Sequence, residues 1–587
     1  MTVEKLITGH IDIWSSALQT RSAAGRGSNG KIDLYGIKKL RELILELAVR
    51  GKLVPQDPND EPASELLKRI AAEKAELVKQ GKIKKQKLLP EISEDEKPFE
   101  LPAGWEWVRL GTIGEIVGGG TPKSDNPQYW AKEGIKWLTP ADLYGLKGKY
   151  ISSGARDITT DGLSNSSARL MPEGTVLFSS RAPIGYVAIS NAELSTNQGF
   201  KSCVPYIKKL SDYIYYYLLS AAKKIDEKAS GTTFKEVSGA IVSKILMPLP
   251  PLEEQSRIVK TVDDLMIICD QLEQQSITSL EAHQQLVKTL LATLTDSQNA
   301  EELAENWVRI SQHFDTLFTT EASIDALKQT ILQLAVMGKL VSQDPNDEPA
   351  SELLKRIEQE KAELVKEGKI KKQKPLPPVS DEEKPFELPE GWVWCRLAEL
   401  VAIKGGKRVS NGYKLLTEPT PHVYIRVADM KDGTIDLSDL KYIDEEMHQK
   451  IKNYIITKDD IYMTIVGATI GKCGTVPALL DGMNLTENAA RLIPSKLISK
   501  DYLYLCLRSD LCQEQFIDKT MQVGVQKMAL NRLANTLIAL PSTNESLRIR
   551  DRVKEMNKLC SKLVCGIIES QQTKLHLVDA LTDATLN

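Results

Sequence analysis

The sequence predicts an α+β protein with an internal pseudo-two-fold repeat, in which two mixed α/β domains are separated by long helices forming an antiparallel coiled coil. Three observations carry this prediction. Lys52–Lys87 recurs as Lys339–Lys374, and all but four of the 36 positions are identical. A segment of short β-type runs follows each copy, and each segment leads into a helical run with heptad spacing. The copies start 287 positions apart, far beyond a solenoid period, so the chain is a duplicated protein.

Length and composition indicate a multidomain globular chain. At 587 residues it is too long for one core, and 42% hydrophobic with 26% charged residues is ordinary for a soluble protein. The sequence has no apolar run approaching ~18 residues and no signal-peptide pattern at its start, so we expect a cytoplasmic protein without a membrane partner. Eight cysteines and six histidines form no metal-binding spacing, so no metal site is expected and the thiols are predicted to be core residues.

The net charge of −3 argues against a uniformly basic surface, but the charge is unevenly distributed. Residues 101–250 carry 17 basic and 13 acidic side chains, and residues 388–541 carry 19 and 18. The remaining residues carry 40 basic and 48 acidic side chains. The repeated framework is therefore acidic, while the two β-rich segments permit nucleic-acid binding without demonstrating it.

These patterns divide the chain into five regions. In order, they are an N-terminal helical region (1–100), a first globular domain (101–250), a central helical region with the second repeat copy (251–387), a second globular domain (388–541) and a C-terminal helix (542–587).

The repeated framework opens with a helix whose apolar residues recur at helical spacing from Ile37 and which ends at Gly51. A second helix follows, with Ser64 predicted as its N-cap and Gly81 after its end. The basic run Lys82–Lys87, repeated up to Lys374, is interpreted as a solvated linker or as a phosphate contact, and its duplication does not separate the two readings.

Each globular domain combines short strands with a helix. In the first, the helix Ser211–Ile225 carries several tyrosines, for which core packing is favoured over stacking on a base. Each domain then leads into a long helix of about 40 residues, roughly 60 Å at ~1.5 Å per residue. Matching positions of the two spines are apolar or Cys and predict that the helices pair with each other. The predicted coiled-coil core consists of Ile258, Val262, Leu265, Cys269, Leu272, Ile549, Val553, Met556, Cys560 and Leu563.

Motifs that resemble catalytic signatures fail on inspection. Asn126–Tyr129 (NPQY) has Gln128 where an amino-methyltransferase motif needs a second proline, and no S-adenosylmethionine loop precedes it. Gly467–Lys472 is one residue short of a phosphate loop, and Cys473 stands where Ser or Thr would hold magnesium. We therefore predict a non-catalytic chain with no catalytic residues and no cofactor of its own.

Polar residues on loops of the two globular domains remain as candidates for DNA contact, because these side chains bind phosphates and base edges. The candidates are Thr121, Lys123, Ser124, Ser179, Ser180, Arg181, Thr196, Asn197, Gln198, Lys404, Lys407, Arg408, Arg426, Thr464, Thr469, Lys472 and Asn488.

The whole arrangement resembles the specificity subunit of type I restriction–modification enzymes, in particular its EcoA-like (type IB) subgroup. The resemblance rests on paired LPxGWxWxRL starts (from Leu101 and Leu388), on PPLEEQSRIV at the end of the first domain, and on the stretches GGGTPKSDNPQYW, SSRAPIGYVAI and STNQGFK. The second domain departs from it, with Ser546 at the position of Gln255.

This resemblance implies that the globular segments are target recognition domains, each reading one half of a bipartite, asymmetric double-stranded DNA site. It also implies a complex with two modification (methyltransferase) subunits and with restriction (motor and nuclease) subunits, which would carry S-adenosylmethionine, ATP and magnesium. The alternative from another class is a protein-interaction scaffold with two globular modules on a coiled coil. An orphan methyltransferase is disfavoured by Gln128.

Overall fold

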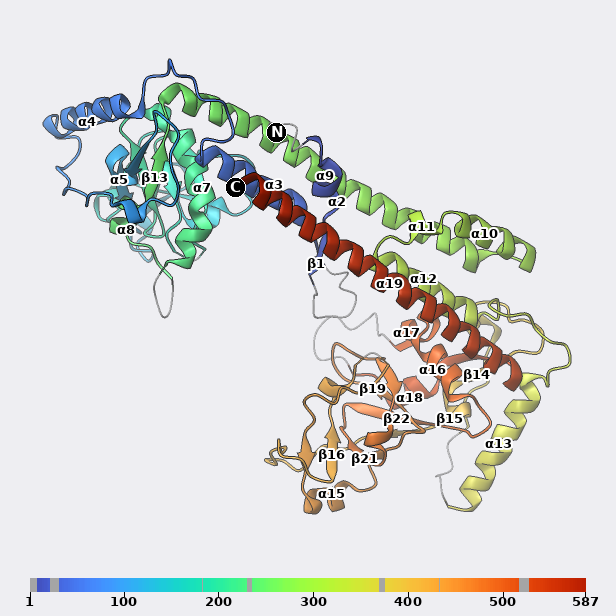
Figure 1. Ribbon diagram of the computed structural model, residues 1–587. Helices are drawn as coiled ribbons and strands as arrows, with labels where there is room; N and C mark the ends of the chain where they lie inside the picture. Colours follow the sequence, from blue (N-terminus) through green and yellow to red (C-terminus); the bar gives the residue numbers. More distant parts are fainter. Residues whose placement is uncertain are drawn as a thin grey trace. The chain divides into compact units, whose positions relative to one another are not determined.

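The computed structural model describes residues 8–21, 31–181, 183–229, 235–368, 375–431, 433–516 and 527–586. The chain divides into two compact units, which are described one at a time (Figure 1). The first unit consists of residues 1–19, 33–277 and 572–587, and the second of residues 20–32 and 278–571. Each unit contains one globular domain and one copy of the repeated framework. The short strands β1 (Gln19–Arg21) and β2 (Lys31–Asp33) pair with each other.

The framework of the first unit is helical. Its helices are α2 (Ile11–Ser16), α3 (Tyr35–Val49), α4 (Ala63–Lys79), the first part of α9 (Leu252–Asp296) and the last part of α19 (Thr543–Leu586). Helix α3 buries its predicted apolar face and ends before Gly51, which has a positive φ of 67°. A Cβ at Gly51 would lie 2.5 Å from the Pro102 ring, so this turn requires glycine. The prediction of Ser64 as the N-cap of this helix is wrong, because α4 begins at Ala63 and already includes Ser64. The Ala63 N–H donates a hydrogen bond to the Gly104 carbonyl.

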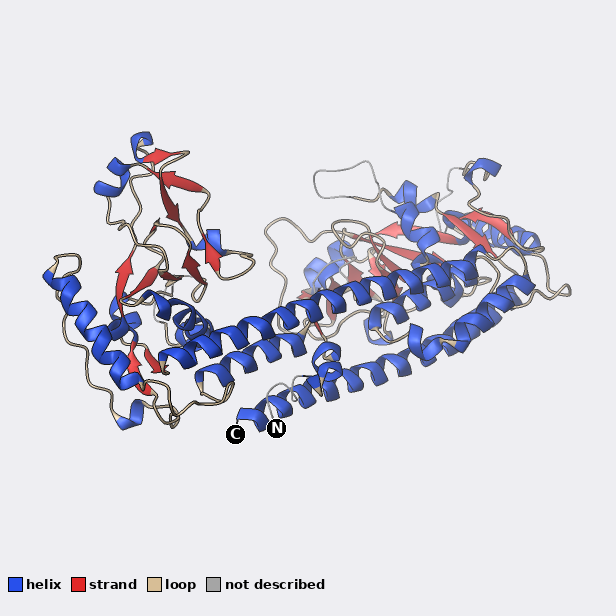
Figure 2. Ribbon diagram, turned by 90° about the horizontal axis from the view of Figure 1, so that it is seen from above, coloured by secondary structure: helices blue, strands red, loops and turns tan. Residues whose placement is uncertain are grey.

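The first globular domain contains two main sheets and a strand pair (Figure 2). Its strands are β3 (Glu106–Arg109), β4 (Gly114–Gly118), β5 (Trp130–Ala131), β6 (Ile135–Leu138), β7 (Tyr150–Ile151), β8 (Arg156–Ile158), β9 (Val176–Phe178), β10 (Val187–Ser190), β11 (Ser195–Thr196), β12 (Lys201–Pro205) and β13 (Leu246–Leu249). Its helices are α5 (Leu110–Ile113), α6 (Thr160–Ser164), α7 (Ser211–Glu227) and α8 (Gly239–Ser243), with 3-10 turns η1 (Glu94–Glu96), η2 (Pro127–Tyr129), η3 (Pro140–Leu143) and η4 (Lys208–Leu210).

The sheets have strand orders β4-β12-β9-β10-β7 and β11-β6-β8-β5, and β3 pairs with β13. Helix α7 packs on the first sheet, and its tyrosines Tyr213, Tyr215 and Tyr216 are buried. The Tyr213 hydroxyl donates to the Pro248 carbonyl at 3.0 Å. The prediction that these tyrosines are core residues is confirmed.

The second unit repeats the plan. Its framework helices are α10 (Ala300–Gln312), α11 (Phe314–Leu317), α12 (Glu321–Val336) and α13 (Ala350–Lys366), together with the end of α9 and the first part of α19. Its strands are β14 (Val393–Arg396), β15 (Val401–Gly405), β16 (His422–Ile425), β17 (Tyr442–Ile443), β18 (Ile455–Ile456), β19 (Ile461–Thr464), β20 (Cys473–Thr475), β21 (Met483–Leu485), β22 (Ala489–Pro494) and β23 (Leu537–Leu540). The remaining helices are α14 (Leu397–Leu400), α15 (Glu445–Ile451), α16 (Lys500–Arg508), α17 (Asp510–Phe516) and α18 (Leu530–Ala534), with turns η5 (Asp381–Glu383), η6 (Val427–Asp429) and η7 (Ala478–Leu480). Its sheets run β15-β22-β19-β20 and β17-β16-β21-β18, and β14 pairs with β23.

A buried joint fastens each long helix to its framework copy. In the first unit, Glu254 of α9 accepts hydrogen bonds from Gln56 at 3.1 Å and from the Trp105 indole at 3.0 Å. Beside it, Arg257 pairs with Asp60 at 2.6 Å.

The second unit contains the same joint. Glu545 of α19 accepts from Gln343 at 3.1 Å and from Trp392 at 2.9 Å, and Arg548 pairs with Asp347 at 2.7 Å. The duplicated sequence therefore encodes duplicated contacts.

The predicted antiparallel pairing of the two long helices is confirmed, and each core also includes a framework helix. Ile258, Val262, Leu265, Cys269 and Leu272 belong to the core of the first unit, together with α3 and with Val578 from the end of α19. Ile549, Val553, Met556, Cys560 and Leu563 belong to the core of the second unit, together with α12 and with Val287, Leu291 and Leu294 from the end of α9. The start of each long helix thus shares a core with the end of the other, as antiparallel helices do, so equivalent positions of the two spines do not meet.

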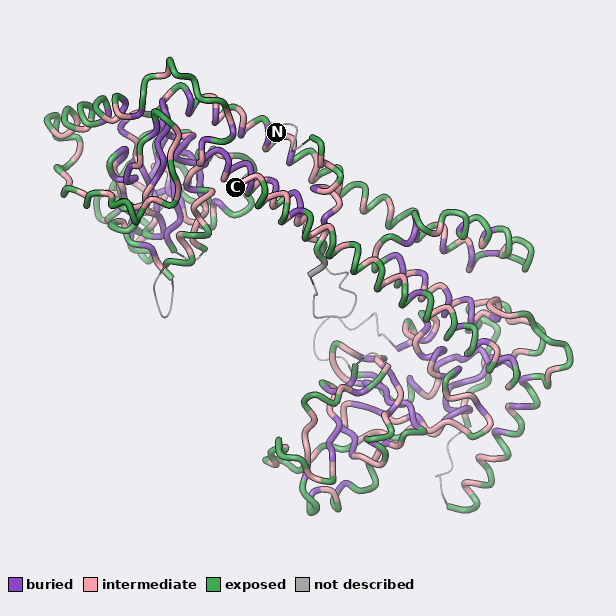
Figure 3. Tube along the Cα trace, in the orientation of Figure 1, coloured by how far each residue is buried: buried purple, intermediate pink, exposed green. Residues whose placement is uncertain are grey.

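A framework helix takes part in each of these cores. In the first unit, Arg41 of α3 pairs with Asp270 and Glu273 of α9, while the Tyr35 hydroxyl donates to Asp579 of α19 at 2.7 Å. Buried residues line these helices on the sides that face the cores (Figure 3). The predicted two-helix seam is therefore, in each unit, a packing that also includes a framework helix.

Candidate nucleic-acid interface

In the first globular domain, polar loops gather at the carboxyl ends of the parallel strands β6 and β11. Thr196 lies opposite Leu138 at the last paired position. Directly after β6, the backbone N–H and hydroxyl of Thr139 both donate to Asp142, at 2.6 and 2.8 Å, and fix the turn η3. Directly after β11, Asn197 accepts from the Gly199 N–H at 2.8 Å. We call residues 119–121, 139–144, 181 and 197–199 the first loop cluster.

Glycine allows the loop after β4 to lie directly on the loop after β11. A Cβ at Gly119 would lie 2.0 Å from the Asn197 carbonyl oxygen and 2.3 Å from that of Thr196. The next residue, Gly120, donates its N–H to the Thr196 carbonyl at 2.8 Å. The chain then places the Thr121 hydroxyl in hydrogen-bond contact with the Gln198 side-chain carbonyl. Two loops distant in sequence are thereby held together.

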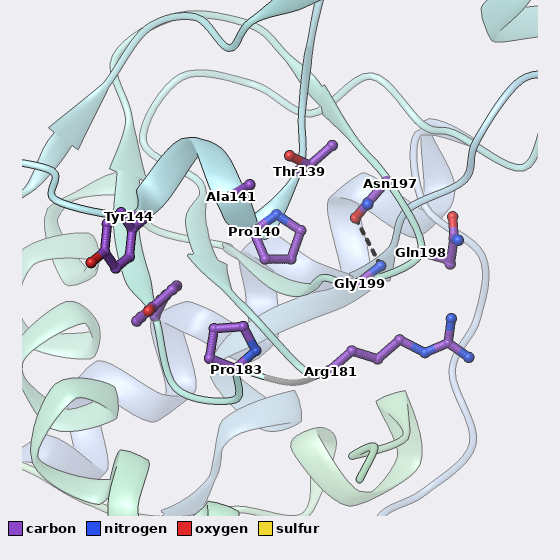
Figure 4. Close-up of a pocket in the computed structure, with 10 residues that line it drawn as sticks. Thr139, Pro140, Ala141, Tyr144, Arg181, Pro183, Asn197, Gln198 and Gly199 are labelled. Carbon is purple, nitrogen blue, oxygen red and sulfur yellow. Dashed lines mark hydrogen bonds between the residues drawn. The ribbon is translucent and has the colours of Figure 1, made fainter. Parts of the chain in front are cut away.

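A pocket of about 490 Å³ lies between the loops that follow β6, β9 and β11 (Figure 4). Its lining consists of Thr139, Pro140, Ala141, Tyr144, Arg181, Pro183, Tyr186, Asn197, Gln198 and Gly199. Tyr144 lies on one side of it and Arg181 on the other, and the Tyr144 side chain is 80% exposed. Arg181 pairs with Glu236 at 2.9 Å. The pocket combines exposed aromatic surface with amide and guanidinium donors, which is the chemistry that contacts bases.

The second globular domain builds the same frame at the carboxyl ends of β16 and β21, where Leu485 lies opposite Ile425. After β16, the Arg426 N–H donates to Asp429 at 2.8 Å and fixes the turn η6. A Cβ at Gly406 would lie 2.1 Å from the Thr486 carbonyl oxygen, so glycine again allows the contact between loops. We call residues 406–408, 426–429, 466 and 486–488 the second loop cluster.

The side chains on this shared frame differ between the two domains. The hydroxyl–amide contact of Thr121 with Gln198 is replaced by an ion pair of Arg408 with Glu487 at 2.6 Å. In the first domain the backbone of Arg181 forms a β-bridge with that of Glu236, whereas in the second domain the equivalent β-bridge joins Val466 and Lys527. At the start of the 3-10 turn, Arg426 replaces Thr139, and its guanidinium is held by Asp429 and Asp439.

Four of the predicted contact residues are buried, and their assignment is corrected. Ser179, Ser180, Thr196 and Thr464 are fully buried, each with 0% of its surface exposed. Ser179 donates to the Pro183 carbonyl at 2.8 Å, Ser180 to the Gly199 carbonyl at 3.2 Å, and Thr464 to the Thr469 carbonyl. In this structure these side chains support the loops from beneath, because a duplex that approaches from solvent cannot reach them.

The other candidates lie at or near the surface. Lys123, Ser124, Lys404 and Lys407 are exposed, and Thr469, Lys472 and Asn488 are half-buried. The basic run Lys82–Lys87 has four exposed lysines, while its second copy from residue 369 to 374 lies outside the described residues.

The sequence prediction missed several residues in the first loop cluster or elsewhere in the same domain. Tyr144 and Glu236 carry no motif, and their place became evident from the pocket and the Arg181 pair. Arg156 stacks on Trp130 with its guanidinium carbon 3.5 Å from the ring centroid, a contact between separate strands. Both contacts join segments that are distant in the sequence, so no local sequence signal marks them.

Metal sites, membrane-spanning helices and disulfides are features of other protein classes. Across the described ranges, no group of three or more His, Cys, Asp or Glu side chains is arranged to hold a metal ion. Within the same part of the chain, none of the helices combines the length and apolar character needed to cross a membrane. All eight cysteines are free thiols, and seven are buried, as predicted, while Cys565 is exposed.

Comparison with known proteins assigns the class of these domains. The family described as "Type I restriction modification DNA specificity domain" matches residues 102–282 and again residues 389–570. Each match begins at a globular domain and extends into the long helix that follows it. The fold and loop clusters thus belong to a class of paired DNA specificity domains.

Full-length relatives give the family. The EcoEI specificity subunit of Escherichia coli is 48% identical over 612 residues, and the EcoAI specificity subunit of the same organism is 49% identical over 616, each alignment covering 100% of both chains. A solved structure described as "Structural basis underlying complex assembly and conformational transition of the type I R-M system" shares the fold, with a TM-score of 0.50 and 18% identity over 84% of this chain and 99% of that one.

The chain belongs to the specificity subunits of type I restriction–modification enzymes, within their EcoA-like (type IB) subgroup. These subunits are non-catalytic, and the enzymatic activity resides in their partners. Family membership decides against the scaffold and orphan-methyltransferase alternatives.

Proposed function

We propose that this chain reads a bipartite, asymmetric sequence in double-stranded DNA, with each globular domain contacting one half-site. One observation carries the proposal: the two domains hold their loops in the same frame but fill that frame with different side chains. The Thr121–Gln198 contact of the first loop cluster corresponds to the Arg408–Glu487 pair of the second. Equal frames favour equal docking on the duplex, and unequal side chains favour unequal base sequences.

The proposed partners are two modification subunits and the restriction subunits. The exposed surfaces at α4 and α13 support two identical partners, because these helices belong to the two copies of the repeated framework and carry the same ion pairs. Arg69 pairs with Glu61 and Arg356 with Glu348, each at 2.5 Å. Lys68 pairs with Glu65 at 2.6 Å and Lys355 with Glu352 at 2.7 Å. Two similar surfaces can bind two copies of one protein.

The proposed division of labour places S-adenosylmethionine, ATP and magnesium on the partner subunits, while this chain binds DNA in the cytoplasm. The sequence motifs for a methyl donor or nucleotide loop fail at Gln128 and Cys473, which supports this assignment.

The experiment is a competition binding assay with the chain in complex with its modification subunits. We expect retention of a labelled duplex that contains the target site, weakened by at least about tenfold between 50 and 200 mM salt because phosphate contacts release counterions. A competitor with one half-site scrambled should compete poorly. Equal competition by every sequence would contradict the proposal.

A further inference from the structure

One pair of positions in the first loop cluster is equivalent, by strand register, to one pair of positions in the second loop cluster. In the first domain, Gly118 pairs with Lys201, and Thr121 and Gln198 lie three residues beyond that pair on each side. In the second domain, Gly405 pairs with Ala490, and Arg408 and Glu487 lie three residues beyond it on each side. In both domains the two side chains at these positions contact each other. We call them the register pair of each domain.

Neighbouring hydrogen bonds confirm the equivalence. The Ser180 N–H donates to the Gly199 carbonyl at 2.7 Å, and the Ile465 N–H donates to the Asn488 carbonyl at 2.9 Å. The register pair is therefore held by matching backbone contacts, and the chemical difference between the domains at this place lies in the side chains.

The register pair of the first domain is neutral. Thr121 and Gln198 are both exposed. Because the Thr121 hydroxyl contacts the amide carbonyl, the amide NH₂ of Gln198 is directed to other acceptors. A primary amide donates and accepts at once, and this matches N7 and N6 of adenine in the major groove.

The register pair of the second domain is ionic. The Arg408 side chain is 69% exposed and Glu487 is 27% exposed. Burial acts to raise the pKa of Glu487, but hydrogen bonds from Arg408, the backbone and Thr486 lower it below its usual value, so the group is a carboxylate at neutral pH. A guanidinium matches O6 and N7 of guanine, and a carboxylate accepts from N4 of cytosine. Together the two side chains complement the major-groove edge of one G·C pair.

We infer that the register pair is a specificity determinant: Gln198, positioned by Thr121, reads an A·T pair in the first half-site, and Arg408 with Glu487 reads a G·C pair in the second. This inference rests on the proposed function and names the bases that it involves. The Glu487 carboxylate also selects against other bases, because it is repelled by the acceptor atoms N7 and O6 of a purine.

The test exchanges the register pairs. One variant carries Thr121→Arg with Gln198→Glu, and the reciprocal variant carries Arg408→Thr with Glu487→Gln. Each is purified with the modification subunits, and its binding is measured against duplexes in which each base pair of the wild-type target is replaced in turn. We expect the first variant to prefer G·C over A·T at one position of the first half-site, and the reciprocal variant to show the converse in the second, each by about 5- to 150-fold.

Lys123→Ala and Lys404→Ala are the matched controls, because both lysines are exposed, lie near the register pairs and lie outside them. They should weaken binding to all duplexes alike. Melting temperature and assembly with the modification subunits verify that each exchanged variant is folded.

The outcomes separate the two proposals. An exchanged variant that assembles but retains the wild-type base preference at every position overturns the inference and leaves the proposed function intact. A wild-type complex that binds all duplexes equally overturns the proposed function itself.

Discussion

The two units are alike where the chain holds itself together and different where its loops meet solvent. Glu254 and Glu545 each accept from one Trp and one Gln at matching distances. The register pairs, in contrast, are Thr121 with Gln198 and Arg408 with Glu487. Identical joints with different loop side chains indicate that the framework is maintained for a common geometry and the loops for distinct targets.

A group of contacts around Lys149 makes the first unit different from the second. Lys149 in the first domain pairs with Asp212 at 2.8 Å and with Asp263 of α9 at 2.9 Å, and the Tyr216 hydroxyl donates to Asp263. Burial opposes the charge of Lys149, but hydrogen bonds to these carboxylates raise its pKa. The position of Asp263 in α9 corresponds to Lys554 in α19, so the second unit cannot form this contact. The first domain therefore adds to the common joint a contact that the second unit cannot form.

The largest expected effect comes from removing the difference between the domains. Replacing residues 389–540 with a second copy of residues 102–249, together with Lys554→Asp to supply the missing carboxylate, should give a site with two half-sites of the first type. Affinity for the original second half-site should fall on the order of 100-fold or more, because each mismatched pair costs ~1–3 kcal/mol. Binding selection from a random duplex library measures this, and unchanged recognition of the original site would contradict it.

Breaking the joints tests whether the units are equivalent. Glu254→Ala and Glu545→Ala each remove the acceptor of an indole N–H, from Trp105 or Trp392, while the amides of Gln56 and Gln343 keep their hydrogen bonds to the Gly51 and Gly338 carbonyls. Each variant should destabilise its unit by about 2 kcal/mol. Chemical denaturation of the complex measures both, and Glu281→Ala on an exposed face of α9 is the control, expected within ~0.5 kcal/mol of wild type. If only one of the two variants lost stability, the joints would be alike in their contacts but not in their contribution to the free energy of unfolding.

Removing the Lys149 ion pairs, which the second unit cannot form, should cause a smaller loss of stability in the first unit. Lys149→Met leaves Asp212 and Asp263 without their common cation, at a cost of about 1 kcal/mol because both carboxylates are partly exposed. Lys554→Met, at the exposed position of α19 that corresponds to Asp263, should cost almost nothing. Thermal unfolding of the two variants compares them, and equal losses would remove the distinction between the units.

The smallest effect concerns pH. Burial raises the pKa of Glu254, although hydrogen bonds from Gln56 and Trp105 oppose it. Its proton is held more tightly in the folded than in the unfolded chain, so its contribution to stability falls as pH rises from 4.5 through the folded pKa and is constant above. Glu254→Gln lacks this titration. The stability of wild type relative to this variant should decline across that window, and a rise would contradict the burial effect.

The sequence was sufficient for the features encoded by local pattern and repetition. The helical period from Ile37, the glycine at Gly51 and the two long helices are confirmed because periodicity and turn chemistry act over a few residues. The frame of the loop clusters was not predictable, since it depends on close contacts such as Gly119 against Asn197 between distant segments.

The errors have a common cause. Ser179, Ser180, Thr196 and Thr464 were predicted as contact residues because polar side chains in loop-like stretches are usually exposed, yet all four are buried. The hydroxyls of Ser179, Ser180 and Thr464 donate to backbone carbonyls inside the fold. The part of the framework helices in the seam was not predicted for a related reason: heptad spacing shows that a helix has an apolar face but does not identify every partner that covers it. In each unit these partners include α3 or α12.

The central claim is that two equal frames with different side chains read two different half-sites. Mapping methylated bases in the genome of cells that carry this chain with its modification subunits tests it most directly. The account predicts one bipartite, non-palindromic motif with unlike halves separated by unspecified bases. A single uninterrupted motif, or one with two identical halves, would contradict it.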